Sequence, residues 1–399
     1  MSWKRTPLTK VSEVVTKGTT PTTLGKQFVS SGIPFLRAQN INGSNIILND
    51  ELLFIDEATN KLLSRSKIIS NDVLLSIAGS IGRSAVVPQH YPLLNCNQAI
   101  AIIRPKTDIV SPYFIKYWLD TEDAQRQIYG AKVTATISNL SLGQIKKLEI
   151  PLPPLPEQKR IAAILDKADA IRRKRQQAIK FADKFLRATF LDMFGNPVSN
   201  PKGWKLRSLR SLTLKIGSGA TPRGGKSAYI NHGISLIRSL NIHDDKFLFK
   251  DLAHITEKQA DGLSNVVVEK SDVLLNITGA SVCRCAMVID EILPARVNQH
   301  VCIIRPNKAI LASQYLLHCL ISKSYKQKLL AIAGAGGATR EALTKQQVEN
   351  LEIPLPPMDL QDKFTLIKNS LRKINNKNLN LFEQPLFNSL TQRAFRGEL

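Results

Sequence analysis

Cysteine and histidine, the residue types that most often carry chemistry, occur here without the spacing of a reactive or metal-binding site. The chain has five cysteines and six histidines, but no CxxC pair and no HExxH motif. Cys283 and Cys285 would share one face of a strand, yet no further ligand stands near them in the sequence. We therefore expect no metal site, and we expect buried or inert reduced thiols at Cys96, Cys283, Cys285, Cys302 and Cys319.

The residues of a methyl-transfer or nucleotide site are also missing. Asn196-Pro197-Val198-Ser199 lacks the second proline and the aromatic ring of the NPPY-like tetrad that would hold a flipped adenine. The glycine-rich run GAGGATR (334–340) follows a predicted helix, whereas a nucleotide cradle follows a strand and opens a helix. There is no GxxxxGK[ST] motif and no spaced acidic cluster. We expect a chain that is not an enzyme by itself, and we interpret the glycine-rich run as a loop near DNA.

The charge balance points to a polyanionic partner. Lys plus Arg outnumber Asp plus Glu by 55 to 32, which gives a net charge of +23. Such an excess is typical of proteins that bind nucleic acid, and an anionic membrane surface is the second possibility. No apolar run reaches the roughly 18 residues of a membrane span, and MSWKRTPLTK has no apolar signal core. We expect a soluble, cytoplasmic protein.

The chain contains an internal sequence repeat. LEIPLPP occupies residues 148–154 and returns at 351–357, and DVLLSIAGS (72–80) pairs with DVLLNITGA (272–280). NQAIAIIRP (97–105) likewise pairs with NQHVCIIRP (298–306). The shift between the copies stays between 200 and 203 residues, so the chain is a tandem duplication of a globular unit with an extension.

Each copy predicts a mixed α/β domain. The expected strands, which would form a mixed sheet, are 33–38, 72–77, 84–87 and 99–103, with 234–239, 272–277, 285–289 and 301–306 in the second copy. One helix should begin at Ser111-Pro112 and run to about residue 128, with its copy from about Ser313. After a small helix, Leu-Glu-Ile should form the last edge strand, which the prolines end.

A long helix should follow each proline arm. The first, about Glu157 to Phe194, would be about 57 Å long and end at Gly195-Asn196-Pro197. Pro385 should break the second, with a separate short helix at about 386–395. Apolar spacing of three and four residues predicts an antiparallel coiled coil, in which Arg175 and Asn378 would face each other. The residues chosen for this seam are Ile164, Ala168, Ile171, Arg175, Phe185, Ile367, Leu371, Ile374, Asn378 and Leu381. The fold class is therefore α+β, with two tandem mixed α/β domains separated by two long helices and a pseudo-twofold internal repeat.

These features together resemble the DNA specificity subunit of a Type I restriction-modification system. The resemblance covers essentially the whole chain and rests on the LEIPLPP arms, PEQKRI (156–161), FLDMFGNP (190–197), AFRGEL (394–399) and the TP turns that follow Gly18 and Gly219. The second copy departs from it, because MDLQDKF (358–364) replaces LPEQKRI and Pro385 interrupts the helix. The implied parts are target-recognition domains at 1–154 and 197–357, and spacer helices at 155–196 and 358–399.

The resemblance also implies the role and the partners. Each recognition domain would read one half of a bipartite asymmetric DNA site, and the helices would set the gap and bind two modification subunits. Restriction subunits would complete a bacterial or archaeal nuclease. S-adenosylmethionine would belong to the modification subunit, ATP and Mg²⁺ to the restriction subunit, and no cofactor to this chain.

The internal repeat divides the candidate DNA contacts. Residues that agree between the copies suit framework or phosphate contacts, and residues that differ suit base reading. The candidates of the first copy are Thr20, Thr23, Arg37, Gln39, Asn40, Arg83, Asn97, Gln98, Lys132 and Thr134. Those of the second are Thr221, Arg223, Lys226, Arg238, Asn241, Arg284, Asn298, Gln299 and Arg340. The run Arg172 to Arg175 is either a solvated helix face or a contact to spacer DNA or an acidic partner surface.

Three other functions stay open from the sequence. The same chain could be the recognition module of a differently organised restriction or methylation system. A self-sufficient methyltransferase is opposed by the missing motifs. A non-specific basic DNA-binding scaffold would bind without sequence preference and lose affinity steeply with salt.

Overall fold

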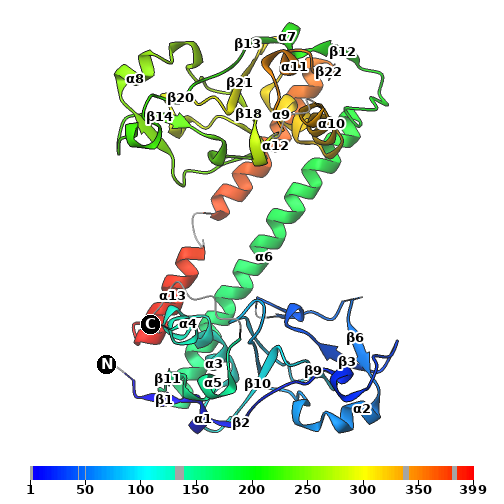
Figure 1. Ribbon diagram of the computed structural model, residues 1–399, viewed down its shortest axis with the longest axis vertical. Coiled ribbons are helices and arrows are strands. Elements are labelled where there is room, and N and C mark those ends of the chain that lie inside the picture. Colours follow the sequence, from blue (N-terminus) through cyan, green and yellow to red (C-terminus); the bar gives the residue numbers. More distant parts are fainter. Residues whose placement is uncertain (1–2, 44, 50, 131–138, 336–340, 380–383) are drawn as a thin grey trace. The chain divides into compact units, whose positions relative to one another are not determined.

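The two copies of the repeated sequence fold into the same set of strands and helices in the computed structural model of the chain (Figure 1). The structure describes residues 3–43, 45–49, 51–130, 139–335, 341–379 and 384–399. It contains two compact units, one of Met1–Gln176 with Asn378–Leu399 and one of Gln177–Lys377. The boundary between the units falls inside the long helix α6 (Leu155–Phe194).

A four-stranded sheet forms the centre of each unit. In unit 1 its order is β2 (Ser12–Lys17), β10 (Ile100–Pro105), β7 (Val73–Ser76), β8 (Ser84–Val86). In unit 2 its order is β13 (Thr213–Ser218), β21 (Val301–Pro306), β18 (Val273–Asn276), β19 (Cys285–Met287). Every pairing in these sheets is antiparallel, so the prediction of one mixed sheet was wrong.

The continuous apolar runs that suggested a mixed sheet are explained by cover on both faces. Val73 and Leu75 pack in one core cluster of unit 1, and Leu74 packs in another. The mixed pairing belongs to a separate three-stranded sheet. Its central strand pairs parallel to one neighbour and antiparallel to the other. That sheet is β3 (Ile33–Leu36), β6 (Leu53–Ile55) and β9 (Asn95–Cys96) in unit 1, and β14 (Ile234–Ile237), β17 (Ala253–Ile255) and β20 (Ala295–Val297) in unit 2.

The repeated LEIPLPP segment forms a strand in each unit, but not at the edge of the main sheet. β11 (Glu149–Pro151) pairs only with β1 (Arg5–Pro7), and β22 (Glu352–Leu355) pairs only with β12 (Lys205–Ser208). The segment thus closes each module by joining its end to its beginning.

The helix predicted after Ser111-Pro112 is two helices. α3 (Pro112–Leu119) ends before α4 (Glu122–Tyr129), because the Thr121 hydroxyl accepts a hydrogen bond from the Ala124 amide and starts a new helix. α9 (Ser313–Ile321) and α10 (Lys323–Gly334) repeat the break. The smaller elements are α1 (Leu8–Val11), α2 (Glu57–Leu62), α5 (Leu142–Lys147), α7 (Leu209–Leu212), α8 (Glu257–Asp261) and α11 (Lys345–Glu349), with hairpins β4 (Ile41–Asn42)/β5 (Asn45–Ile46) and β15 (Ile242–His243)/β16 (Lys246–Phe247).

The long helices end where proline and glycine predict. α6 stops at Gly195, whose φ of +77° and amide bond to the Leu191 carbonyl (2.9 Å) close its last turn. The second long helix is α12 (Met358–Leu379), and α13 (Gln384–Arg396) is a separate helix beginning beside Pro385.

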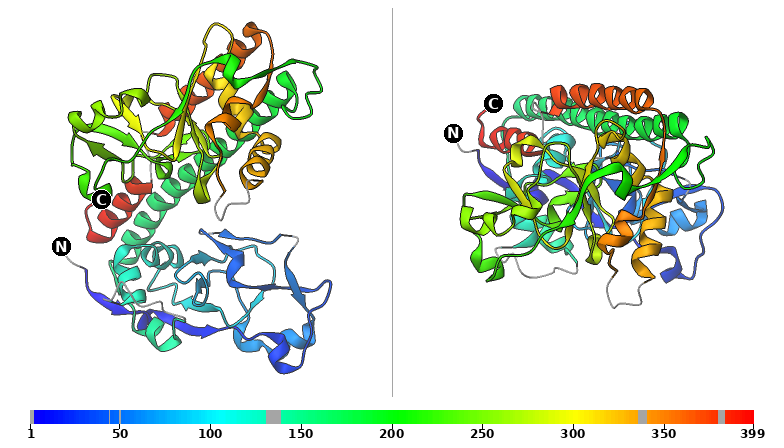
Figure 2. Two further views of the ribbon diagram at one scale, coloured as in Figure 1. Left: turned by 45° about the horizontal axis from the view of Figure 1, so that its top comes forward. Right: turned by 90° about the horizontal axis from the view of Figure 1, so that it is seen from above.

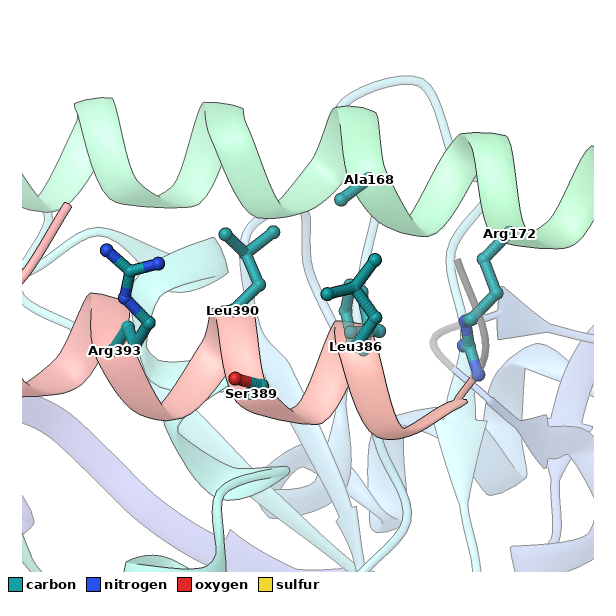
Figure 3. Close-up of a pocket in the computed structure, with 7 residues that line it drawn as sticks. Ala168, Arg172, Leu386, Ser389, Leu390 and Arg393 are labelled. Atoms are coloured by element: carbon teal, nitrogen blue, oxygen red, sulfur yellow. The ribbon is translucent and has the colours of Figure 1, made fainter. Parts of the chain in front are cut away.

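Within each unit, α6 packs antiparallel to one of these helices (Figure 2). In unit 1 the Arg160 guanidinium donates to the Leu399 carbonyl (3.1 Å), whereas Arg172 lies over the Phe387 ring (5.0 Å). As residue numbers rise on α6 they therefore fall on α13. Figure 3 shows Leu386 and Leu390 of α13 pointing toward Ala168 of α6. In unit 2 the Phe364 ring of α12 meets the rings of Phe190 and Phe194 at 5.5 and 5.6 Å.

The predicted seam differs from the face that α6 buries. Ala168 is buried and Ile164 and Arg175 are half-buried, but Ile171 is 43% and Phe185 is 56% exposed. Leu165 and Leu186 are buried instead. One heptad pattern fails here because the two halves of α6 pack against different helices and modules. Ile367 and Leu371 of α12 are half-buried; the side chains of Ile374 and Asn378, the residue Leu381, and with them the Arg175–Asn378 hypothesis lie outside the described part.

A buried glutamine attaches each α/β module to the helix that follows it. The Gln158 amide oxygen accepts from the Ser111 amide (2.9 Å), and its nitrogen donates to the carbonyls of Ile109 (3.1 Å) and Pro153 (2.8 Å). Gln361 makes the same three bonds, to Ala312, Ile310 and Pro356. Both side chains are fully buried. MDLQDKF therefore keeps the glutamine of LPEQKRI that holds the helix.

In the described ranges, no helix is long and apolar enough to cross a membrane.

Candidate nucleic-acid interface

The loops that carry most candidate DNA contacts meet at one edge of the main sheet of unit 1. Because the sheet is antiparallel, β2 and β7 end where β10 and β8 begin, as the pairs Lys17–Ala101, Ser76–Ile100 and Leu75–Ser84 establish. The end of β3 joins them, since the Asn97 amide donates to the Leu36 carbonyl (3.0 Å). We call this the loop edge; it comprises residues 18–24, 37–40, 77–83 and 97–99.

Unit 2 has an equivalent loop edge, made of residues 219–228, 238–241, 277–284 and 298–300. Its registers are Ser218–Cys302, Asn276–Val301 and Leu275–Cys285. The Asn298 amide donates to the Ile237 carbonyl (3.0 Å). The duplication thus provides two surfaces of the same construction.

A threonine and a glutamine are hydrogen-bonded to each other at each loop edge. The Thr20 hydroxyl donates to the side-chain oxygen of Gln98, and Thr221 does the same to Gln299. Gln98 and Gln299 are exposed, and the threonines are half-buried. The structure therefore brings together residues that lie 78 positions apart in the sequence.

Glycine makes this approach possible. A Cβ on Gly18 would lie 2.0 Å from the Cys96 carbonyl oxygen, and one on Gly219 would lie 1.7 Å from that of Val297. No side chain fits at these distances, so the strand end can pass the neighbouring backbone only at glycine.

Several candidates that agree between the copies hold the loops rather than face outward. The Asn40 oxygen accepts from the Arg37 amide (2.8 Å) and its nitrogen donates to the Ile47 carbonyl (3.1 Å). Asn241 does the same for Arg238 (3.1 Å) and Leu248 (2.9 Å). Asn40 and Asn241 are buried, which makes them framework residues.

The paired arginines and the other two asparagines also bond to the loop backbone, but the arginines are only half-buried. The guanidinium groups of Arg37 and Arg238 donate to the carbonyls of Glu51 and Asp251, and both side chains are half-buried. Asn97 and Asn298 each accept from the amide two residues ahead, at 3.1 Å. These contacts fix the loops, while the outer part of each arginine stays at the surface.

The remaining candidates lie at the surface where the structure describes them. Thr23, Gln39, Arg83, Arg223 and Lys226 are exposed, and Arg284 is half-buried. The position equivalent to Gln39 in the second copy is Leu240, which is 40% exposed. Lys132, Thr134 and Arg340 lie outside the described residues, as does most of the glycine-rich run after Gly334.

An ion pair that the sequence reasoning missed joins two neighbouring strands of each main sheet, at the end opposite the loop edge. Arg104 donates two hydrogen bonds of 2.8 Å to Asp72, and Arg305 donates bonds of 2.8 and 2.9 Å to Asp272. Burial raises the pKa of the Asp72 carboxyl, and the bonds from Arg104 oppose that rise. The signal was present, because the aspartate of DVLL and the arginine of IIRP recur in both copies.

The cysteines have no reactive environment. All five are free and buried, and burial raises the pKa of the Cys283 thiol to about 12. Cys283 does not share a strand face with Cys285 as predicted, because its φ of +65° places it in the turn before β19. Among the described residues, no group of three or more His, Cys, Asp or Glu could hold a metal ion.

The helix α6 carries the basic run and two exposed aromatic rings. Arg172 and Arg173 are bound to the buried Asp169, at 3.0 and 3.3 Å, and Arg173 also donates to Asn45 (2.7 Å). Arg172 and Arg173 of the basic run are therefore held in internal ion pairs. Phe181 and Phe185, one turn apart, are 58% and 56% exposed.

Comparison with known proteins agrees with this architecture. The Type I restriction modification DNA specificity domain matches the chain twice, over residues 2–180 and 201–383. The type I restriction enzyme MjaIX specificity subunit of Methanocaldococcus jannaschii is 24% identical over 100% of this chain and 93% of its own. The EcoKI specificity subunit of Escherichia coli K12 is 21% identical over 92% of this chain and 82% of its own. The Type I restriction-modification S subunit from M. genitalium has a similar fold, with a TM-score of 0.62, 14% identity and coverage of 99% of this chain and 96% of its own.

Proposed function

This chain belongs to the Type I restriction-modification DNA specificity family, and we propose from this premise that it is the non-catalytic subunit that selects the DNA target. Each recognition domain reads one half of a bipartite, asymmetric site. The observation that carries the proposal is the duplicated loop edge, where the shared Asn40 and Asn241 are buried in the framework and differing residues such as Gln39 and Leu240 lie exposed. Two equivalent surfaces with unlike readers suit two unlike half-sites.

The helices are the proposed docking place for two modification subunits. Phe181 and Phe185 support this role, because neighbouring large rings more than half exposed gain most from a partner surface. In this proposal the modification subunits supply S-adenosylmethionine, and restriction subunits that join the complex supply ATP and Mg²⁺. The complex works in the cytoplasm.

The alternative of a non-specific basic scaffold remains a second candidate, because a net charge of +23 is enough for salt-sensitive binding to any DNA. It predicts binding without preferred letters. The specificity proposal instead predicts that the exposed readers of both loop edges restrict the sequence.

Mapping of methylated adenines separates the two. The full chain would be mixed with its modification subunit, S-adenosylmethionine and random-sequence duplex DNA, and the methylated positions sequenced. We expect a split asymmetric motif only when the chain is present. Methylation at scattered sites, or the same motif without the chain, would show that the sequence is selected elsewhere.

A further inference from the structure

Among the differences between the two loop edges is one pair of neighbouring, half-buried positions. In unit 1 the pair is Ala78 and Ala99, and in unit 2 it is Thr278 and His300. The backbone is the same in both: the Ile77 amide donates to the Ala99 carbonyl (2.8 Å), and the Ile277 amide donates to the His300 carbonyl (3.0 Å). The two copies therefore carry different side chains on the same backbone arrangement.

The second copy joins its two side chains by a hydrogen bond. The Thr278 hydroxyl lies 2.6 Å from His300 Nδ1. Both residues are half-buried, and the exposed Gln299, bound to Thr221, directly precedes His300. In the first copy the same space is bounded by two methyl groups, which can neither donate nor accept a hydrogen bond.

This bond restricts what the imidazole can do. A neutral imidazole has one donor and one acceptor nitrogen, and the hydroxyl occupies Nδ1. Only Nε2 then remains to bond another group, either as a donor or as an acceptor. The bond to Thr278 also fixes the orientation of the imidazole ring. A positioned polar group of this kind can distinguish base edges, whereas an alanine can favour only an apolar contact such as a thymine methyl.

We propose that Thr278 and His300 form a base-reading element of unit 2 that unit 1 lacks. His300 contacts a hydrogen-bonding base edge of the second half-site, and Thr278 is its positioning residue. The proposal rests on the proposed function, since it assigns part of the specificity of that DNA-reading surface.

The test uses the full chain in complex with its modification subunit, methylating random-sequence DNA. Thr278→Ala/His300→Ala should reduce discrimination at one position of the second half-site by about 5- to 10-fold. The first half-site should keep all its letters, and so serves as the internal control for folding. The reciprocal Ala78→Thr/Ala99→His should change one position of the first half-site only.

Single substitutions at Thr278 test the positioning role. Thr278→Ser keeps the hydroxyl and should keep the wild-type preference, whereas Thr278→Val keeps the shape and should weaken the preference at the same position as the double variant. Unchanged letters in both halves would overturn the proposal, and so would loss of both halves together, which would mean that the pair supports only the fold. A wild-type chain without any split motif would instead refute the proposed function.

Discussion

At the scale of single residues, buried amide groups decide how each module is held. Gln158 and Gln361 each satisfy one backbone donor and two backbone acceptors where water does not reach. Removing such a side chain leaves several buried polar groups without partners, which costs more than a surface hydrogen bond contributes. The joint between module and helix therefore depends on one residue in each copy.

Replacement of Gln158 by leucine tests how much these hydrogen bonds contribute to the free energy of unfolding. Gln158→Leu should lower the free energy of unfolding by about 3 kcal/mol, because the Ser111 amide and the Ile109 and Pro153 carbonyls lose their partner. Gln176→Leu, at an exposed site on the same helix, should stay within about 0.5 kcal/mol of wild type. Chemical denaturation of the full chain measures both, and equal effects of the two changes would contradict this role.

His318 should give the fold a dependence on pH. Burial lowers its pKa to about 4 from an ordinary value of 6.5. Between these values the unfolded chain binds more protons than the folded chain, so stability should fall as pH falls from 6.5 to 4. The predicted loss is about 3 kcal/mol. Unfolding curves at pH 7 and pH 4 measure it, and His318→Asn should lose that much less over the same interval; parallel pH profiles would refute the assignment.

At the scale of elements, a glycine lets each outer strand reach the loop edge. Gly219 directly follows β13 and lies against the Val297 carbonyl, whereas a Cβ on Gly217, inside β13, would meet nothing within 4 Å. Neither has a left-handed φ. Comparing Gly219 with Gly217 therefore separates the effect of the close backbone contact from the general effect of a glycine in an extended segment.

Alanine at the two positions should have opposite consequences. Gly219→Ala should destabilise the chain by about 3 kcal/mol or more, since the strand end must move away from Val297. It should also weaken reading of the second half-site, because Thr221 would lose its place beside Gln299. Gly217→Ala should be neutral or stabilise by up to about 1 kcal/mol. Thermal unfolding together with half-site preference measures both, and a tolerated Gly219→Ala would contradict the close approach.

The elements also set the limit of what the sequence could predict. Apolar runs bounded by turns predicted the main strands, and Pro385 predicted the separate α13. Thr121 was overlooked as the start of a new helix because the apolar pattern continues through it. The face that α6 buries could not be predicted, since it depends on which helix packs against each half of α6.

At the scale of the whole molecule, duplication separates framework from function. The Asp72–Arg104 and Asp272–Arg305 pairs, and the buried Asn40 and Asn241, recur because both copies need the same scaffold. Sequence reasoning could predict that the candidates cluster in loops. It could not tell Asn40 from the exposed Gln39, because burial of a loop residue depends on contacts far along the chain.

The independence of the two modules is the central claim of this account. We would replace residues 3–150 by the matching module of another family member and map the methylated adenines again with the same modification subunit. The account predicts that one half of the split motif takes new letters while the other half stays unchanged. New letters in both halves, or none in either, would contradict it.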